Sequence, residues 1–483
     1  MNYSPIDPAI AVSTSLADQI NNAVAPFSAF VNSIIFFKIS LFGVSVPLVV
    51  IWLIAAATIL TIGLGFINIR GFGHAIALTF NREKPSASAP GEISHFQALT
   101  SALSGTVGLG NIASVPIAIV LGGPGAMVWM MLAGVLGMSS KFAECTLAVK
   151  YRLIAPEGRV HGGPMYYIEE VFTRKGLKSV GRGLAIFFAV MTMGASISVF
   201  QINQAHAQFE SVTGLSAPLI FGVLMAGGVA IVILSGIKMI GRVTSILVPA
   251  MGAIYLGAGL SIILVNITAL PEAIGLVIRS AFGFEAVGGG LVGALIIGIQ
   301  RATYSSEAGV GSAAIAHAAV KTDEPLTEGF VALLEPFIDT VIVCGVTALV
   351  IIITGVYEPF LAAENLRGIE VTSAAFETMF SWYPIVLLVS VILFAFSTLV
   401  AWAYYGAQAA AYLFGATKRV DVIFKLILCL ILSTGAAIQL SAIIDFIDAM
   451  LFGMCIPNII ALYLLLPELK EDLAAYQLKR RGG

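Results

Sequence analysis

Long hydrophobic stretches separated by short polar loops make up most of this chain. Eleven of them approach or exceed the ~20 residues that a helix needs to cross ~30 Å of hydrocarbon. None shows the ~10-residue alternation of a transmembrane β-strand. The pattern predicts an all-α integral membrane protein with eleven transmembrane helices. The predicted spans are residues 44–66, 95–121, 126–151, 184–209, 217–236, 244–266, 291–319, 330–356, 383–414, 422–437 and 443–466.

Three shorter segments have a different pattern. Residues 16–42 alternate apolar and polar positions, which favours a helix lying at the membrane interface. Residues 271–282 and 371–380 are too short to span and are predicted to form helices on the extracellular surface.

Composition agrees with a membrane location. Of the 483 residues, 58% are hydrophobic and only 11% charged, whereas soluble domains carry roughly 25% charged residues. The net charge of −2 gives no indication of a nucleic-acid partner. The four cysteines lie singly within apolar spans and the five histidines are scattered. We therefore predict no disulfide framework and no metal cluster.

The basic residues predict the orientation. With the N-terminus outside, twenty of the 25 lysines and arginines fall in cytoplasmic loops or the C-terminal tail. The opposite orientation violates the positive-inside rule. Eleven spans then place the C-terminus in the cytoplasm.

Residues 103–116 interrupt the second span with glycines, hydroxyls, an amide and a proline. Each glycine costs a helix about 1 kcal/mol relative to alanine. Irregular backbone at membrane depth survives only inside protein or beside a cavity. We predict that the N–H groups of Gly108, Leu109 and Gly110 bind a carboxylate, with the Thr106 hydroxyl nearby. The alternative is that these glycines only allow close packing of helices.

A second interruption follows about two hundred residues later, at residues 300–312, with the sequence QRATYSSEAGVGS. Paired interruptions in corresponding halves indicate the central site of a secondary transporter. The candidate substrate-binding residues in this motif are Ser305, Ser306, Glu307 and Gly309.

Arg301 and Glu307 are ionisable residues predicted near the middle of the membrane, where a charge is costly. We expect them to form an ion pair that either contacts the substrate or only holds the unwound backbone. By contrast, Lys141 and Glu144 lie one turn apart near the cytoplasmic end of their span. There the lysine is expected to extend its amine to the interface.

Two further polar clusters lie in the fourth and ninth spans. Gln201 and Asn203 are candidates for substrate contact, and the hydroxyls of Ser397 and Thr398 for an alkali cation, which prefers oxygen ligands. A serine–threonine pair in a membrane helix also commonly bonds to its own backbone carbonyls.

The first span leaves ten others, five in each half, and each half opens with an interrupted helix. Five crossings per half give the halves opposite topology, as inverted repeats require. The predicted organisation is an extracellular N-terminal segment (1–43), an extra transmembrane helix (44–66), a first repeat (95–266), an extracellular linker (267–290), a second repeat (291–466) and a cytoplasmic tail (467–483).

At these residues the chain resembles the alanine or glycine:cation symporter family. The matching strings are GLGNIA, AIVLGGPGA, GMSSKFAE, LAVKYR, GGPMYYI, SSEAGVGSA, IAHAA, FAFST and WAYYG. The resemblance implies a leucine-transporter-like fold with two discontinuous helices. Many members have asparagine where this chain has Ser306, which bears on the preferred substrate but not on the class.

The resemblance also implies site roles. The backbone of Leu109 and Gly110 would meet the substrate carboxylate, and Gln201 and Asn203 match polar positions beside the substrate. The sodium ligands would be the backbone carbonyls of Ser104, Val107 and Phe394. The hydroxyls of Ser397 and Thr398 would complete the site.

From these observations we expect a symporter of a prokaryotic inner membrane that carries a small neutral amino acid, alanine or glycine first, coupled to sodium. We expect no organic cofactor and no enzymatic activity. Proton coupling with Glu307 as the carrier is an alternative. A channel is another, but it needs a continuous polar pore rather than two unwound points.

Overall fold

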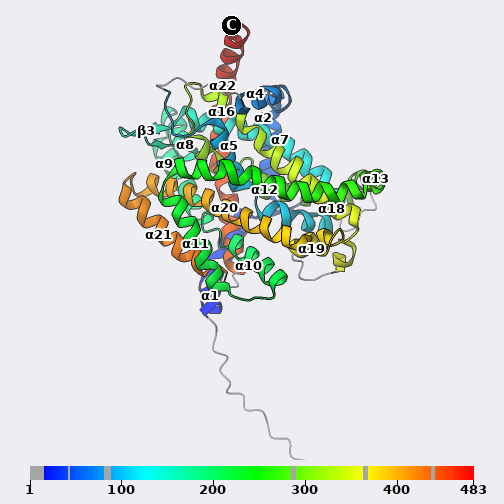
Figure 1. Cartoon of the computed structure of the whole chain (residues 1–483). Coiled ribbons are helices and arrows are strands. Elements are labelled where there is room, and N and C mark those ends of the chain that lie inside the picture. Colours follow the sequence, from blue (N-terminus) through cyan, green and yellow to red (C-terminus); the bar gives the residue numbers. More distant parts are fainter. Residues whose placement is uncertain are drawn as a thin grey trace, which may run out of the picture.

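The computed structural model describes residues 16–41, 44–80, 89–283, 290–362, 368–436 and 441–482. These residues form one helical bundle with two short β-hairpins (Figure 1). Residues 1–15 of the predicted N-terminal segment and residues 284–289 of the predicted linker lie outside the described residues. The C-terminal end of the last helix projects from the bundle at the end opposite to α1 (Leu16–Ile35).

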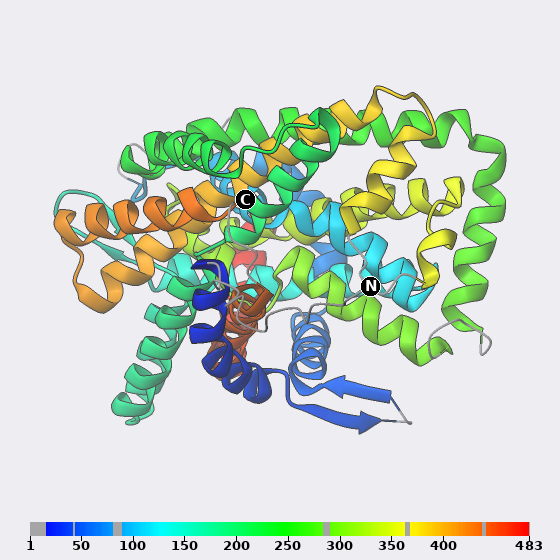
Figure 2. The same cartoon turned by 90° about the horizontal axis from the view of Figure 1, so that it is seen from below.

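The N-terminal region departs from the prediction. Val44–Pro47, predicted as the start of a span, forms β2 and pairs antiparallel with β1 (Lys38–Leu41). The hairpin lies at the edge of the bundle (Figure 2). The first apolar helix, α2, therefore runs from Leu48 to Gly63, after a proline that lacks a backbone donor. It packs against α7 and is followed by α3 (Ile67–Arg70) and α4 (Phe72–Phe80).

The first half of the chain contains the first interrupted helix. Its elements are α5 (His95–Thr106), η1 (Gly110–Ser114), α6 (Val115–Gly122), α7 (Ala126–Lys150), β3 (Leu153–Ile154), β4 (Val160–His161), α8 (Pro164–Arg174), α9 (Lys178–Ala195), α10 (Val199–Thr213), α11 (Pro218–Leu234) and α12 (Ile237–Val265).

The second half begins with η2 and with α13, which lies at the edge of the bundle (Figure 1). Its elements are η2 (Ile267–Ala269), α13 (Leu270–Phe282), α14 (Gly290–Ser306), α15 (Ser312–His317), α16 (Pro325–Ala332), α17 (Leu334–Pro336), η3 (Phe337–Val343), α18 (Cys344–Thr354), η4 (Glu358–Ala362), α19 (Gly368–Glu377), α20 (Tyr383–Phe414), α21 (Lys418–Thr434) and α22 (Ser441–Gly482).

Within the described residues, six helical runs are long and apolar enough to cross a membrane, and seven if α5 and the bent η1–α6 segment count as one. The chain is thus a multi-pass membrane protein. The helix over 383–414 has the predicted bounds. The predicted fourth span lies within the helical run Lys178–Thr213, in which residues 196–198 separate α9 from α10. α22 continues through most of the predicted tail.

α19 is not the simple surface helix that its length predicts. Its Ile369, Val371 and Phe376 are buried. Thr372 donates a 2.7 Å hydrogen bond to the carbonyl of Ile112, inside η1. A Cβ on Gly368 would lie 1.7 Å from the Ala113 carbonyl oxygen. This helix therefore covers the first interruption at close range.

Lys141 does not reach the interface, contrary to the prediction. Its side chain is fully buried, and its amine lies 3.0 Å from the Glu335 carboxylate. Because the spacing within α7 points Lys141 toward α15 and α17 rather than toward lipid, a buried partner replaces water.

Breaking this buried pair should destabilise the fold. Lys141→Met leaves the Glu335 charge uncompensated, so we expect a loss of about 3–5 kcal/mol, and a double change with Glu335→Gln to cost less than the sum of the single changes. SDS-induced unfolding of the purified protein measures both values. Arg174→Gln, which removes exposed pairs to Glu170 and Glu468, is the control and should cost about 1 kcal/mol or less. Additive effects would contradict the pairing.

Candidate functional site

The first interruption separates α5 from η1. α5 ends at Thr106, Val107 is extended with φ −74° and ψ 93°, and the helix resumes at Gly110 in another direction, bent by 47°. The Gly108 N–H donates to the Asn111 side-chain oxygen at 2.9 Å. A substrate carboxylate would therefore compete with Asn111 at Gly108, and Leu109 and Gly110 are the better-placed donors.

The second interruption separates α14 from α15. α14 ends at Ser306, and Glu307 has φ 51°, an unusual left-handed conformation for a residue with a side chain. Gly309 and Gly311, both with φ 90°, complete the turn before α15 begins at Ser312. The Glu307 carboxylate accepts a hydrogen bond from the Ser312 hydroxyl. Strained backbone of this kind is common at functional sites.

The two interruptions lie against each other. A Cβ on Gly110 would be 3.7 Å from the Tyr304 carbonyl oxygen and 3.9 Å from the Ser305 Cα. The Asn111 side-chain amide donates to the Ser305 hydroxyl at 2.9 Å and to the Asp339 carboxylate at 2.6 Å. Ser305 donates to the same carboxylate at 2.6 Å. These buried hydrogen bonds join the two unwound segments to η3.

A cavity of about 260 Å³ opens where the interruptions meet. Eight predicted residues line it: Thr106, Gly108, Leu109, Gly110, Gln201, Arg301, Glu307 and Thr398. Other lining residues were not predicted, among them Ser114, Ser198, Tyr304, Trp402 and Asp448. The lining of the cavity is thus a mixture of polar and apolar side chains.

Three polar atoms of the cavity residues are buried without a hydrogen-bond partner in the described part of the chain. They are the Gln201 side-chain oxygen, the Thr398 hydroxyl and the Arg301 Nε. The Thr398 hydroxyl lies 2.7 Å from where a Cβ of Gly108 would stand. An unpaired buried polar group costs about 1–3 kcal/mol, so these atoms indicate a place for a polar ligand.

Four predicted substrate residues do not line the cavity. Ser305 bonds to Asp339, Ser306 bonds back to the Ala302 carbonyl at 3.0 Å, and the Gly309 carbonyl accepts from Asn458 at 2.9 Å. Asn203 is half-buried and accepts from Gln204 at 3.3 Å. Of the residues predicted in the second motif to bind substrate, Glu307 lines the cavity. Ser305, Ser306 and Gly309 instead form hydrogen bonds within the helix bundle.

The predicted sodium ligands lie on α20 and at the first interruption. Ser104, Phe394 and Ser397 are fully buried, and Val107 is 3% exposed. The Ser397 hydroxyl donates to the Phe394 carbonyl at 3.0 Å, the back-bond that the alternative predicts. Thr398 does not do this, because its hydroxyl faces Gly108 without a partner.

The predicted ion pair between Arg301 and Glu307 is not formed. The Arg301 guanidinium lies over the Tyr304 ring, 5.6 Å from its centroid, whereas Glu307 is bonded to Ser312. Six residues on, Glu307 has left the helical path, so it does not share a helix face with Arg301. Both side chains nevertheless reach the same cavity.

Sequence reasoning missed Asp339 and Asp448. Each is a carboxylate inside a predicted hydrophobic span, a signal that indicates function by default. Asp339 holds both interruptions, and Asp448 of α22 lines the cavity. The available signal was therefore the same one that selected Arg301 and Glu307.

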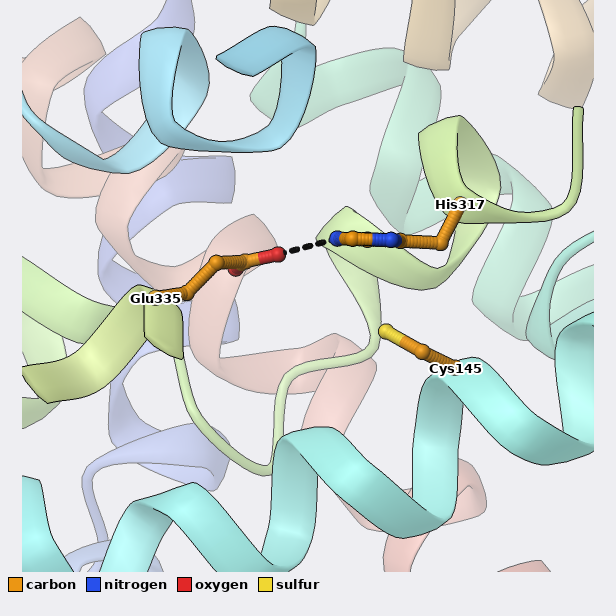
Figure 3. Close-up of side chains that lie close together, drawn as sticks. All are labelled: Cys145, His317 and Glu335. Carbon is orange, nitrogen blue, oxygen red and sulfur yellow. Dashed lines mark hydrogen bonds and ion pairs between the residues drawn. The ribbon is translucent and has the colours of Figure 1, made fainter. Parts of the chain in front are cut away.

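The structure also brings together Cys145, His317 and Glu335, which the sequence separates widely (Figure 3). Their potential ligand atoms lie within 4.8 Å of one another, a grouping of one histidine with a cysteine and a glutamate that the sequence did not predict. Both ring nitrogens of His317 are already engaged, Nδ1 by Glu328 and Nε2 by Glu335. That arrangement suits a protonated imidazole better than a metal ligand.

A cavity lined by polar and apolar side chains at two helix interruptions in an all-α membrane bundle is typical of a secondary transporter. The whole-chain fold agrees: MhsT, solved in complex with L-phenylalanine, superposes with a TM-score of 0.52 at 16% identity over 78% of this chain and 89% of that one. The fold is thus of the leucine-transporter type.

Residues 29–483 match the model of the sodium:alanine symporter family, and the chain belongs to this family. It is 38% identical over 438 residues to the sodium/alanine symporter AgcS of Methanococcus maripaludis, covering 90% of this chain and 95% of that protein. It is 32% identical to the amino-acid carrier protein AlsT of Bacillus subtilis, covering 91% and 93%. The predicted resemblance is confirmed, and the protein is a cation-coupled amino-acid symporter.

Gly108 and Gly110 should respond differently to alanine. A Cβ at Gly108 would stand 2.7 Å from the Thr398 hydroxyl, whereas at Gly110 the nearest atom is 3.7 Å away. We expect Gly108→Ala to perturb the empty site and lower thermal stability. Gly110→Ala should fold normally yet weaken amino-acid binding at least tenfold, about 1.4 kcal/mol, because it blocks approach to the backbone.

Thermal melting with and without alanine measures both effects. Gly227→Ala, where a Cβ meets nothing within 4 Å, is the control. Unchanged alanine binding by Gly110→Ala would exclude this backbone as the carboxylate site.

Proposed function

We propose that the protein is a sodium-coupled symporter that carries a small neutral amino acid, alanine or glycine first, into the cell. The observation that carries this proposal is the 260 Å³ cavity at the meeting of two interruptions, with three unpartnered polar atoms around it. The family and its sodium/alanine relative support the same substrate class.

The amino-acid carboxylate is proposed to bind the N–H groups of Leu109 and Gly110, where η1 begins. Helix starts carry a partial positive charge, and these residues line the cavity. The unpartnered oxygen of Gln201 lies on the same side, 3.8 Å from a Cβ at Gly108, and can accept from the substrate ammonium.

Acidic residues of the cavity complete the ammonium site. Glu307 and Asp448 both line it, and Arg301 offsets part of their charge. Apolar Trp402 and Leu451 leave room for only a small side chain. The cavity therefore offers backbone N–H groups for the carboxylate of a zwitterion and acidic side chains for its ammonium group.

Sodium is proposed to bind between the first interruption and α20. The Thr398 hydroxyl already faces Gly108, and the Ser104, Val107 and Phe394 carbonyls with the Ser397 hydroxyl would supply further oxygens. Alkali and alkaline-earth cations prefer such oxygen ligands.

The proposed architecture has eleven transmembrane helices, with α2 (Leu48–Gly63) as an extra helix before inverted repeats at 95–266 and 291–466. The N-terminus would lie outside and the C-terminus in the cytoplasm. Transport would follow alternating access, in which the helices with interruptions rock around the fixed cavity.

Uptake of labelled alanine into proteoliposomes, with and without an inward sodium gradient, tests the function. The symporter proposal requires accumulation against the alanine gradient that depends on sodium. Accumulation that follows an imposed pH gradient instead favours proton coupling through Glu307. Uptake that never exceeds equilibrium favours a channel.

Thr398→Ala tests the cation site. We expect the sodium dependence of uptake to move to about tenfold higher concentration, since one oxygen ligand is lost, and uptake to recover when sodium is raised. Because binding is reciprocally linked, alanine affinity at low sodium should weaken by a similar factor.

Ser390→Ala on the same helix removes a hydroxyl that is bonded to the Val386 carbonyl, and it serves as the matched control. Sodium dependence that is the same in Thr398→Ala and in this control would remove Thr398 from the cation site.

A further inference from the structure

A pocket separate from the substrate cavity lies at the end of the bundle from which α22 projects, where α4 and α22 lie side by side (Figure 1). Its volume is about 260 Å³. Side chains of α3, α16 and α22 line it, among them Arg70, Phe330, Tyr476, Gln477 and Arg480. None of these residues lines the substrate cavity. We call it the basic pocket because two arginines form part of its wall.

Arg70 and Arg480 come from opposite ends of the chain. Arg70 is the last residue of α3, and Arg480 lies in the last turn of α22. The Arg70 Nη1 donates to the Gly65 carbonyl at 3.2 Å, which holds this guanidinium in place. Among the described residues, no carboxylate forms an ion pair with either arginine. Glu324 acts electrostatically on the Tyr476 hydroxyl, but it does not line the pocket. The pocket therefore has two positive charges that the described part of the chain leaves uncompensated.

Aromatic rings form the rest of the wall. The ring centroids of Phe330 and Tyr476 are 5.7 Å apart, and His74 packs edge-on against Phe330 at 4.8 Å. The Tyr476 hydroxyl lies 2.8 Å from the His74 Nε2, so it is already hydrogen-bonded. The two guanidiniums and the Gln477 amide are the polar side-chain groups left for a ligand. A guanidinium presents its N–H groups as a planar fork that matches the oxygens of a phosphate group. The wall is therefore suited to a small phosphate-bearing anion.

Exposed apolar side chains adjoin the basic pocket along the chain. Phe66 and Ile69, which precede Arg70, are 51% and 68% exposed. Phe66 has φ 57°, a conformation rare for an aromatic residue, at the turn between α2 and α3. On α4, Ile76 and Phe80 are exposed as well. Short helices with apolar and basic side chains on their surface are typical of segments that lie at a membrane interface. Because α2 ends at the same turn, the proposed architecture places the pocket at the depth of the lipid headgroups.

We propose that the basic pocket binds the headgroup of an anionic phospholipid, with the phosphate oxygens held between the Arg70 and Arg480 guanidiniums. A free phosphate ion offers the same oxygens. The exposed apolar side chains favour the lipid, since only a lipid also supplies acyl chains that cover them. In the proposed orientation the pocket faces the cytoplasmic leaflet, whose negative lipids attract basic groups beside the membrane. The site goes beyond the proposed transport function and uses none of its residues.

A bound headgroup joins two segments that the chain connects only through most of its length. One phosphate between the two arginines ties α3, directly after α2, to the end of α22. The two positive charges repel each other in the empty pocket, and the phosphate removes that repulsion. A ligand that binds the folded protein and not the unfolded chain raises the stability of the fold as its concentration rises. The expected signature is thus stabilisation by an anionic lipid that a neutral lipid does not give.

Native mass spectrometry and thermal melting of the purified protein test the site, with phosphatidylglycerol as the anionic probe and phosphatidylcholine as the neutral one. The wild type should retain phosphatidylglycerol in preference and melt at a higher temperature in its presence. The double variant Arg70→Gln, Arg480→Gln should need about a hundredfold more phosphatidylglycerol for the same stabilisation, because each guanidinium lost removes charge-assisted hydrogen bonds. The matched control is Arg182→Gln with Arg242→Gln, which removes two exposed arginines outside the pocket and should behave as the wild type.

Three results overturn the proposal. The first is equal retention of the two lipids by the wild type. The second is a loss of preference in the control variant as large as in the pocket variant, since net charge alone then explains the binding. The third is inorganic phosphate that raises the melting temperature as much as phosphatidylglycerol does, which assigns the pocket to a soluble anion. Arg480→Gln alone, at the exposed end of α22, provides the same comparison if the double variant does not fold. None of these measurements involves transport, so their outcome is independent of the proposed function.

Discussion

The structure depends on hydrogen-bond partners for the backbone groups that leave the helical path inside a membrane. Hydrocarbon offers no partner for a free N–H or C=O group, so each interruption needs protein around it. The side-chain oxygen of Asn111 accepts a hydrogen bond from the Gly108 N–H, and its amide group donates to Ser305 and Asp339. α19 covers the other side through Thr372. One buried network therefore holds both interruptions, and the cavity exists because they are held together.

The same network explains which residues are free to bind ligands. Polar side chains that secure the backbone, such as Ser305 and Asn111, have their hydrogen bonds filled. Gln201 and Thr398 face the opening with atoms left unpaired. A polar ligand in the cavity would recover part of that cost. Support and recognition are thus divided between neighbouring residues rather than shared by them.

The sequence predicted the helical class, and it placed breaks close to where α5 and α14 end, because glycine, proline and charge are rare in hydrophobic spans and therefore stand out. The family was predicted from a resemblance in short motifs and is confirmed. It did not predict the hairpin at Lys38–Pro47 or the buried face of α19, since short segments depend on what they pack against. It also assigned Lys141 to the interface. The position of Lys141 within its span indicates its depth in the membrane. It does not indicate that a carboxylate from a distant segment, here Glu335, lies beside it.

Contacts between residues that are distant in the sequence matter most for the ionisable side chains. Arg301 and Glu307 are close in sequence but have separate partners, whereas His317 and Glu335 meet Lys141 and Cys145 across long intervals of chain. Buried charges cost too much to remain alone, so each must be compensated wherever the fold allows. In this protein compensation draws α5, α7, α15 and α17 together directly behind the cavity. Removing one partner of such a pair would leave a buried charge uncompensated and would weaken contacts between elements that are distant in the sequence.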